Sequence, residues 1–140
     1  MSDATTQERP AALGRKIPAP AVTLESKPFW DAAREGRFLL KKCTACNQPH
    51  WYPRAICPYC MSSETEWVES PGEGVVYTFS IMRRTPSEPY AIGYVTLDEG
   101  VSVLTNFVDV TADQLQIGMR VKVRFQETEG GPPVPVFRPV

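Results

Sequence analysis

Apolar and polar residues alternate over much of the C-terminal half of the chain, a pattern typical of half-buried β-strands. The alternation is clearest in 119–128, where apolar side chains at 121, 123 and 125 face one way and polar side chains face the other. Runs of this kind are rich in β-branched and aromatic residues, which favour strands. Five of them are predicted to be strands: 74–84, 90–97, 101–110, 119–128 and 134–140.

The connections between these runs indicate how the strands are arranged. Asp98-Glu99-Gly100 is a tight hairpin turn between the second run and the third. A short helical or looped connection at 111–118 precedes the fourth run. Five short strands with one longer connection before the fourth predict a small Greek-key barrel of the OB type, and a small β-sandwich is the main alternative.

A short helix is predicted at 26–36, together with strands at 37–43 and 65–71. Ser26 can cap the start of the helix, and Gly36 is a natural stop. A proline in the first turn costs little, because its missing N–H would be unpaired there anyway.

Two adjacent aromatic residues, Phe29 and Trp30, share one face of this helix with Ala33. A helix of this length is stable only when such a face packs against something. Two interpretations are open: the aromatic residues pack against the rest of the chain, or they form a surface for a partner or ligand.

All four cysteines of the chain lie in one cluster, which is the strongest chemical signal in the sequence. Cys43 and Cys46 form one Cys-x-x-Cys knuckle, and Cys57 and Cys60 form a second one ten residues later. Two knuckles can direct four sulfurs at one point, and zinc favours such a tetrahedral site. An iron site is the alternative, because four sulfurs discriminate weakly between the two metals. Disulfides and a thioredoxin-like redox pair fit less well.

The four cysteines would supply every ligand of this metal, so no position stays open for water or substrate. The site is therefore predicted to be structural and to stiffen residues 37–70, which have few apolar residues of their own. Trp51 and Tyr52, between the knuckles, are expected to cover the metal and the domain seam or to recognise another molecule. His50 is not expected to act as a ligand or a base.

The predicted organisation is that of a mainly β protein in three parts. Residues 1–25 are polar, contain prolines and show no periodicity, which indicates a flexible N-terminal arm. Residues 26–70 hold the helix and the zinc ribbon, and residues 71–140 hold the OB-fold barrel.

Composition and charge exclude several classes of protein. The chain has 140 residues, of which 42% are hydrophobic, as expected of a globular protein with its own core. The net charge of −1 disfavours a strongly basic nucleic-acid binder. Nucleic-acid binding stays as the alternative function, because OB-folds and zinc ribbons both occur in such proteins. The sequence has no apolar run of the about 18 residues that span a membrane and no secretory signal, so a cytoplasmic location is expected.

Catalytic motifs are not recognisable in the sequence, which has neither a nucleophile elbow nor a Gly-rich phosphate loop. Arg83 and Arg84 begin the loop that follows the first barrel strand. A pair of this kind can bind a phosphate, and it can equally be a solvated strand end.

The order of several motifs resembles the acyl-CoA-associated proteins that join a rubredoxin-like zinc ribbon to an OB-fold. The resemblance covers about residues 26–140. Its motifs, besides the two knuckles, are Pro28-Phe29-Trp30, Glu35-Gly36-Arg37-Phe38, Tyr52-Pro53-Arg54, Trp67, Gly72-x-Gly74-x-Val76-Tyr77-x-Phe79, Pro89-Tyr90, Leu97-Asp98-Glu99-Gly100 and Ile117-Gly118-Met119-x-Val121.

This resemblance implies an auxiliary subunit with no catalytic residues of its own. Its partner would be a thiolase-like acyl-CoA enzyme, such as a thiolase, a hydroxymethylglutaryl-CoA synthase or a retro-aldolase, in a hetero-oligomer. The barrel would help to bind the CoA thioester, with Arg83 and Arg84 as candidates for its phosphates. The ribbon and the helix would dock the partner, with candidate contacts at Phe29, Trp30, Trp51 and Tyr52.

The chain departs from the family pattern directly after each knuckle, where the family often has glycine. These positions are Asn47 and Met61. Asparagine tolerates the left-handed backbone conformation, whereas methionine adopts it poorly. The second knuckle is therefore expected to have a different shape, although its ligands are intact.

Overall fold

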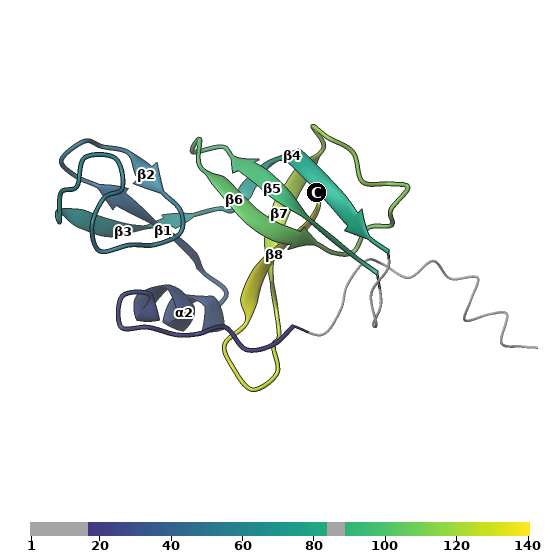
Figure 1. The fold of residues 1–140 in the computed structure, drawn as a ribbon, viewed down its shortest axis with the longest axis horizontal. Helices are drawn as coiled ribbons and strands as arrows, with labels where there is room; N and C mark the ends of the chain where they lie inside the picture. The colour runs from purple at the N-terminus through teal and green to yellow at the C-terminus, as the bar shows by residue number, and fades with distance from the viewer. Residues whose placement is uncertain (1–16, 84–88) are drawn as a thin grey trace, which may run out of the picture.

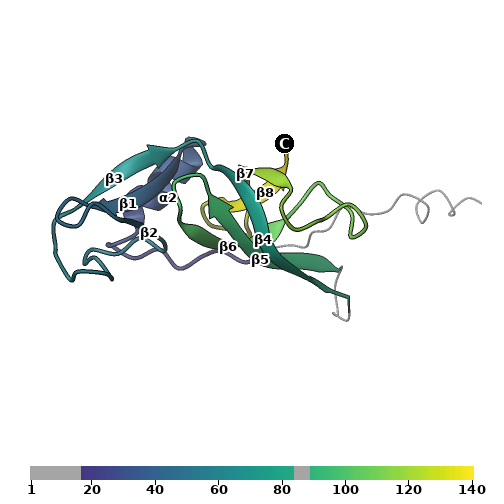
Figure 2. The same cartoon turned by 90° about the horizontal axis from the view of Figure 1, so that it is seen from above.

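The computed structural model describes residues 17–83 and 89–140, which form a short helix, a small sheet and a barrel. The helix and the small sheet gather at one end of the molecule and the barrel forms the other, as two perpendicular views show (Figure 1, Figure 2). In these residues no helix is long and apolar enough to cross a membrane. The elements are α2 (Lys27–Arg34), β1 (Phe38–Cys43), β2 (Pro49–His50), β3 (Thr65–Ser70), β4 (Glu73–Met82), β5 (Tyr90–Leu97), β6 (Ser102–Phe107), β7 (Arg120–Gln126) and β8 (Val134–Pro139).

Five strands close into a barrel in the order β4-β5-β6-β8-β7. Neighbouring strands are antiparallel, except that β6 and β8 meet in parallel at Phe107 and Phe137. This closed barrel confirms the OB-type prediction and excludes the sandwich. The connection at 111–118 consists of turns. The barrel core consists of buried inward-facing side chains, among them Val76, Val95, Val103, Phe107, Val121 and Phe137.

Strand β1 is the centre of the small sheet, with β2 on one side and β3 on the other. The register places Lys41 of β1 opposite both His50 of β2 and Trp67 of β3. The Lys41 ammonium lies 4.6 Å from the centroid of the Trp67 ring and donates a hydrogen bond to the Thr65 hydroxyl at 3.1 Å. Burial lowers the pKa of Lys41, because it disfavours the charged ammonium. The cation–π contact and the hydrogen bond compensate for this burial.

Helix α2 is held in place by its aromatic face. The Phe29 side chain is 0% exposed, and its ring lies edge-on to the rings of Trp30 and Trp51, with centroids 4.8 and 5.2 Å away. It also meets Phe38 of β1 at 6.0 Å. Burying one such side chain stabilises a fold by about 1.5–3 kcal/mol. The aromatic residues of α2 therefore pack against the rest of the chain, as the first interpretation of the sequence predicted, and do not form an exposed surface for a partner.

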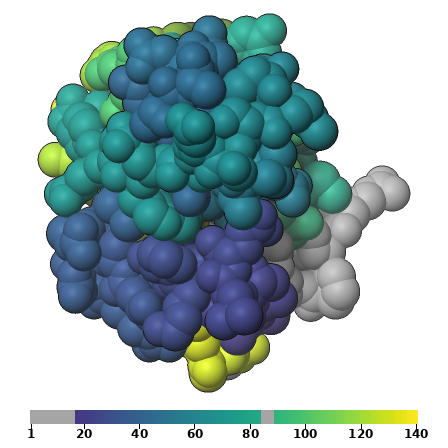
Figure 3. Space-filling model, turned by 90° about the vertical axis from the view of Figure 1, so that its left-hand side faces the viewer, coloured from purple at the N-terminus to yellow at the C-terminus, as the bar shows by residue number. Residues whose placement is uncertain are grey.

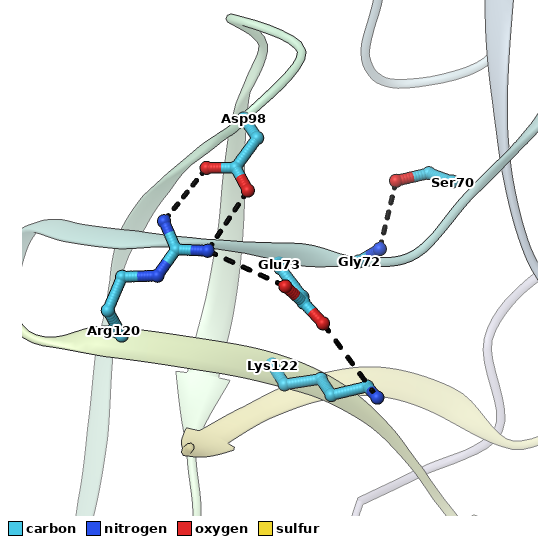
Figure 4. A network of polar contacts seen from close by, with 6 residues as sticks. All are labelled: Ser70, Gly72, Glu73, Asp98, Arg120 and Lys122. Carbon is cyan, nitrogen blue, oxygen red and sulfur yellow. Dashed lines mark hydrogen bonds and ion pairs between the residues drawn. The ribbon is translucent and has the colours of Figure 1, made fainter.

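The small sheet and the barrel are joined at Gly72, between β3 and β4. The Gly72 amide donates to the Ser70 hydroxyl at 2.9 Å (Figure 4), and its carbonyl accepts from the Val123 amide at 2.8 Å. Gly72 has a φ of +69°, and a Cβ there would lie 2.7 Å from Val123 Cβ. Only glycine fits this crossing without distortion, because it needs both the left-handed conformation and the missing side chain.

A network of charges ties three strands together at the ribbon end of the barrel (Figure 4). Arg120 of β7 donates to both oxygens of Asp98 at 2.9 and 3.0 Å and lies 3.6 Å from Glu73 of β4. Lys122 lies 3.9 Å from the other carboxylate oxygen of Glu73. The hydrogen bonds from Arg120 lower the pKa of Asp98.

The predicted arm, 1–25, falls partly within the described residues, which begin at Ile17. The Ile17 carbonyl accepts a hydrogen bond from the Glu129 amide at 3.0 Å, and Pro18 forms a parallel bridge with Glu129. At the other end of this segment, the Glu25 carboxylate accepts a hydrogen bond from the Ala55 amide. Residues 17–25 therefore run along the barrel and the ribbon, and residues 1–16 lie outside the described residues.

Candidate metal centre and adjoining groove

The four cysteine sulfurs converge at the tip of the small sheet. Cys43 ends β1, and hydrogen bonds from the Cys43 amide to the Gln48 carbonyl and from the Cys57 amide to the Ser62 carbonyl close the two knuckles. All four Sγ atoms lie within 4.8 Å of one another. The Sγ–Sγ distances are 3.6 Å for Cys43 and Cys60, and 3.7 Å for Cys46 and Cys57.

This arrangement fits a tetrahedral metal. Zinc–sulfur bonds of about 2.3 Å in a tetrahedron place sulfurs about 3.8 Å apart, close to the two distances above. Backbone amides also point at the sulfurs, from Cys46 to Cys43 Sγ at 3.4 Å and from Tyr59 to Cys57 Sγ at 3.3 Å. The Cys46 amide lowers the pKa of Cys43 to about 7, whereas burial raises the pKa of Cys46 to about 12. Metal binding must therefore displace protons and depends on pH.

The two knuckles end in the same left-handed turn. Asn47 and Met61, the residues after the knuckles, have φ values of 65° and 67°. The expectation of a differently shaped second knuckle was wrong. The cysteine geometry requires the left-handed turn, although this conformation is strained for methionine. This conformation costs a non-glycine residue about 1–2 kcal/mol.

His50 belongs to β2 of the small sheet and is not one of the residues that gather at the sulfur cluster. It is 1% exposed, and neither ring nitrogen has a hydrogen-bond partner among the residues that the structure describes. Burial lowers its pKa, so the ring is neutral near pH 7. A neutral, enclosed imidazole acts here as a core side chain.

The four aromatic residues expected to contact a partner fall into two pairs. Phe29 and Trp30 are buried, so their side chains are taken up by packing within the chain and do not provide an exposed surface. Trp51 and Tyr52 are half-buried: each packs against Phe29 on one side and lines a groove on the other. Sequence alone could not separate these pairs, because an amphipathic helix buries its aromatic face against any surface available.

Arg83, one of the two arginines expected to bind a phosphate, is exposed just after the end of β4. Arg84 lies outside the described residues. Met82, directly before Arg83, pairs with Tyr90 at the start of β5. Arg83 therefore marks the end of the barrel away from the ribbon, as the course of β4 in Figure 1 shows.

A groove of about 520 Å³, which we call the ribbon–barrel groove, runs between the ribbon and strands β5, β6 and β8. Exposed outward-facing residues of β6 form its floor, and the N-terminal segment contributes to its wall. No local pattern in the sequence indicates this groove, because its lining comes from segments far apart in the chain. The large apolar and aromatic side chains that line it are Ile17, Trp51, Tyr52, Tyr94, Leu104 and Val134.

The fold and the cysteine cluster define a protein that joins a four-cysteine ribbon to an OB-type barrel. Two family models match consecutive parts of the chain: the ChsH2 rubredoxin-like zinc ribbon domain at 30–66 and the ChsH2 C-terminal OB-fold domain at 67–126. The chain belongs to the DUF35/ChsH2 family, as the resemblance of its motifs had indicated.

Curated relatives carry two kinds of name. A probable enoyl-CoA hydratase alpha subunit of Thermomonospora curvata is 33% identical over 138 residues, covering 96% of this chain and 42% of that protein. DUF35 domain-containing scaffold proteins are 32% identical over 91 residues in Methanocaldococcus jannaschii and 37% identical over 102 residues in Pyrococcus furiosus. These two matches cover 61% and 68% of this chain, and 64% and 74% of the relatives. The chain thus spans less than half of the Thermomonospora protein and less than two thirds of the Methanocaldococcus protein.

Two solved structures share the fold. A structure named "Ltp2-ChsH2(DUF35) aldolase" has a TM-score of 0.77 and 32% identity, and the match covers 86% of this chain and 98% of that chain. A DUF35-family protein of unknown function from Sulfolobus solfataricus has a TM-score of 0.63 and 15% identity, with 85% of each chain covered. The second likeness supports the fold alone.

Proposed function

We propose that this protein is an auxiliary, non-catalytic subunit of a thiolase-like acyl-CoA enzyme that forms or cleaves a carbon–carbon bond. The observation that carries the proposal is the likeness to the chain in the Ltp2-ChsH2(DUF35) aldolase, at 32% identity over 98% of that chain. The Thermomonospora relative, named as a hydratase subunit, supports the same link to CoA thioesters. In this role the ribbon docks the partner enzyme and the barrel helps to hold the thioester.

The metal in this proposal is a structural zinc, held by Cys43, Cys46, Cys57 and Cys60. Zinc would cross-link the two knuckles and fix the ribbon tip, and it would leave no open coordination position for chemistry. The contribution of this chain is then to order the active site of its partner and not to supply an acid or a base.

The surface that we propose for the partner is the second-knuckle patch, formed by Ile56, Tyr59 and Met61. These apolar side chains are 44%, 65% and 73% exposed on a single knuckle. Figure 3 views the end of the molecule to which this knuckle belongs, with the ribbon above helix α2 and the N-terminal segment. Large apolar side chains gathered on a rigid surface are typical of protein interfaces. Met61 also keeps a strained backbone at an exposed position, which folding alone does not favour.

The proposal is tested by purifying the tagged full-length protein from its native host and identifying what accompanies it. The expected result is a thiolase-like enzyme in stoichiometric amount, whose carbon–carbon bond activity on CoA thioesters is higher in the complex than alone. A Tyr59→Glu bait should lose this enzyme, because the charge would be buried at the interface. An Ala45→Glu bait is the matched control, because Ala45 is exposed on the other knuckle.

Two outcomes would overturn the proposal. One is a bait that purifies alone, and the other is a bait that purifies with nucleic acid, seen as a raised ratio of absorbance at 260 to 280 nm. The second result would instead support the nucleic-acid alternative. Captured enzyme that acts equally well without this protein would also contradict the auxiliary role.

A further inference from the structure

Strand β7 has a neighbouring strand on both sides over only part of its length. β8 pairs with it over 121–126, whereas β4 pairs with it only over 120–122. The last hydrogen bond on the β4 side runs from the Val123 amide to the Gly72 carbonyl at 2.8 Å. The Gly72 amide does not return this bond to β7, because it donates to the Ser70 hydroxyl instead (Figure 4). Within the described residues, the edge of β7 on this side is therefore open beyond Val123.

The open edge presents the backbone groups of Phe125. Backbone groups of successive residues in a strand point to alternate sides. Because Val123 points to the β4 side, Arg124 points to β8 and Phe125 points to the open side again. In the part of the chain that the structure describes, neither the amide nor the carbonyl of Phe125 has a hydrogen-bond partner. An unpaired edge of this kind is a template for one more strand.

This edge forms one side of a cleft of about 410 Å³, which we call the β7 cleft. The opposite side comes from residues 36–37, before β1, and from the end of β3. The cleft has an apolar floor, to which Phe38, Val123 and Phe125 contribute, and the rings of Phe38 and Phe125 have centroids 6.3 Å apart. The β7 cleft shares no lining residue with the ribbon–barrel groove and is a separate site.

The β7 cleft carries an excess of positive charge. Its lining holds three cationic side chains, those of Arg37, Lys122 and Arg124, and a single carboxylate, that of Glu69. Glu69 is engaged by Arg37, whose guanidinium lies 3.5 Å away. The two cations of β7 project from the same face of the strand, since they are two positions apart. An anionic group that enters the cleft along β7 would therefore meet both of them.

The carboxylates around these two cations are shared with other cations. Glu73 lies 3.9 Å from Lys122 and also forms an ion pair with a second residue of β7. One oxygen of Asp109 faces both Arg124, at 3.5 Å, and Arg138, at 3.6 Å. The register also places Lys122 directly opposite Arg138, and like charges in this position destabilise a sheet. Folding alone does not favour this arrangement, whereas a bound acidic group would relieve it.

We infer that the β7 cleft binds an extended acidic segment of a partner protein, which adds as a strand to the open edge at Phe125. Side chains of an added strand alternate between its two faces. One set would lie on the apolar floor, and the other set would bring carboxylates to Lys122 and Arg124. Residues 1–16 of this chain fit the cleft less well, because they contain three cations and two carboxylates. The inference does not rest on the proposed function, since the cleft and the second-knuckle patch share no residue.

The inference is tested with the full-length, metal-loaded protein and a displayed library of random short peptides. We expect selection to enrich acidic peptides with apolar residues at alternate positions. A synthetic copy of the enriched peptide is then the probe, and calorimetry measures its affinity. Arg124→Glu should weaken binding at least about tenfold, because it repels the acidic side chains. Arg138→Glu is the matched control and should weaken binding less than about threefold, because it loses the same contact with Asp109 but lies outside the cleft.

Two further measurements report whether the probe pairs as a strand. Hydrogen exchange of the Phe125 amide should slow when the probe binds, whereas the Arg124 amide, which faces β8, should be protected in both states. Methylation of alternate backbone nitrogens of the probe should abolish binding in one phase and leave it intact in the other. The reason is that only one edge of an added strand faces β7.

Several outcomes would overturn the inference. A selection that enriches no acidic peptide would mean that the cations only keep the open edges of two copies apart. An affinity that Arg124→Glu leaves intact, or a Phe125 amide that exchanges equally fast with the probe bound, would also contradict it. A chain without residues 1–16 that binds the probe at least about tenfold more tightly would assign the edge to that segment instead. Circular dichroism checks that every variant is folded.

The Tyr59→Glu protein separates this inference from the proposed function. It should bind the probe as the wild type does, because Tyr59 lies outside the β7 cleft. Loss of the probe from this variant would contradict the inference, whereas loss of the enzyme alone concerns only the second-knuckle patch. Either proposal can therefore fail while the other stands.

Discussion

Asn47 and Met61 hold the same left-handed conformation, each one residue after its knuckle, with φ values of 65° and 67°. Replacing Met61 by glycine removes the strain of about 1–2 kcal/mol but adds backbone freedom to the unfolded chain. The expected net result is a gain of about 0.5–1 kcal/mol in the free energy of unfolding, measured by denaturant titration with metal present. Asn47→Gly should gain less, because asparagine tolerates this conformation.

Met61→Gly should also weaken capture of the partner enzyme, because it removes an exposed apolar side chain from the second-knuckle patch. Stability and partner binding would then change in opposite directions in one variant. An unchanged affinity for the partner would remove Met61 from the proposed interface, whatever its effect on stability.

Removal of one cysteine should unfold the ribbon. Cys57→Ser is expected to lose the bound metal and to destabilise the protein by at least about 3 kcal/mol, since structural zinc supplies about 10–16 kcal/mol of apparent binding energy in zinc-finger peptides. Metal analysis and the fluorescence of Trp51 and Trp67 report these losses. Ser63→Ala, an exposed change in the same segment, is the control. A Cys57→Ser protein with one metal per chain and normal partner capture would refute a structural metal site.

Gly72 and Gly36 allow strain and crowding to be measured separately. Both have positive φ values, +69° and +81°, but a Cβ at Gly36 would meet no atom within 4 Å. Gly36→Ala should therefore cost only the conformational strain, about 1–2 kcal/mol. Gly72→Ala should cost about 2–4 kcal/mol, because its methyl group also crowds Val123. Equal losses of unfolding free energy in the two variants would contradict this prediction and would show that the Val123 side chain moves aside at no cost.

The pair of Asp98 and Arg120 should make stability depend on acid. Because Arg120 depresses the pKa of Asp98 in the folded protein, the pair stabilises the fold above the unfolded pKa of about 3.9. That contribution disappears as the pH falls from about 4 through the lower pKa of the folded state. Asp98→Asn should therefore lose less stability than the wild type over this range. Glu99→Gln, an exposed change in the same hairpin, should follow the wild type, and high salt should reduce the difference.

Local patterns in the sequence predicted most of the fold and the convergence of the four cysteines. Runs of β-branched and aromatic residues, with clear alternation at 119–128, identified all five barrel strands. The spacing of the two knuckles correctly predicted that Cys43 and Cys60 lie close together, although they are seventeen positions apart in the sequence. The two-residue strand β2 was missed, because Pro49 and His50 are too few to show a period. The groove was missed for a different reason: Ile17, Trp51 and Val134 meet only after the chain has folded, and no local pattern indicates that they lie together.

The crossing at Gly72 has a mechanical consequence for the whole molecule. Hydrogen bonds on both sides of this residue and the packing of Val123 against it leave no pivot between the ribbon and the barrel. If the ribbon tilts, the barrel and its groove then turn by the same angle. A residue inserted at 71–72 would therefore change the angle between the ribbon and the barrel, and with it the shape of the groove that both of them line.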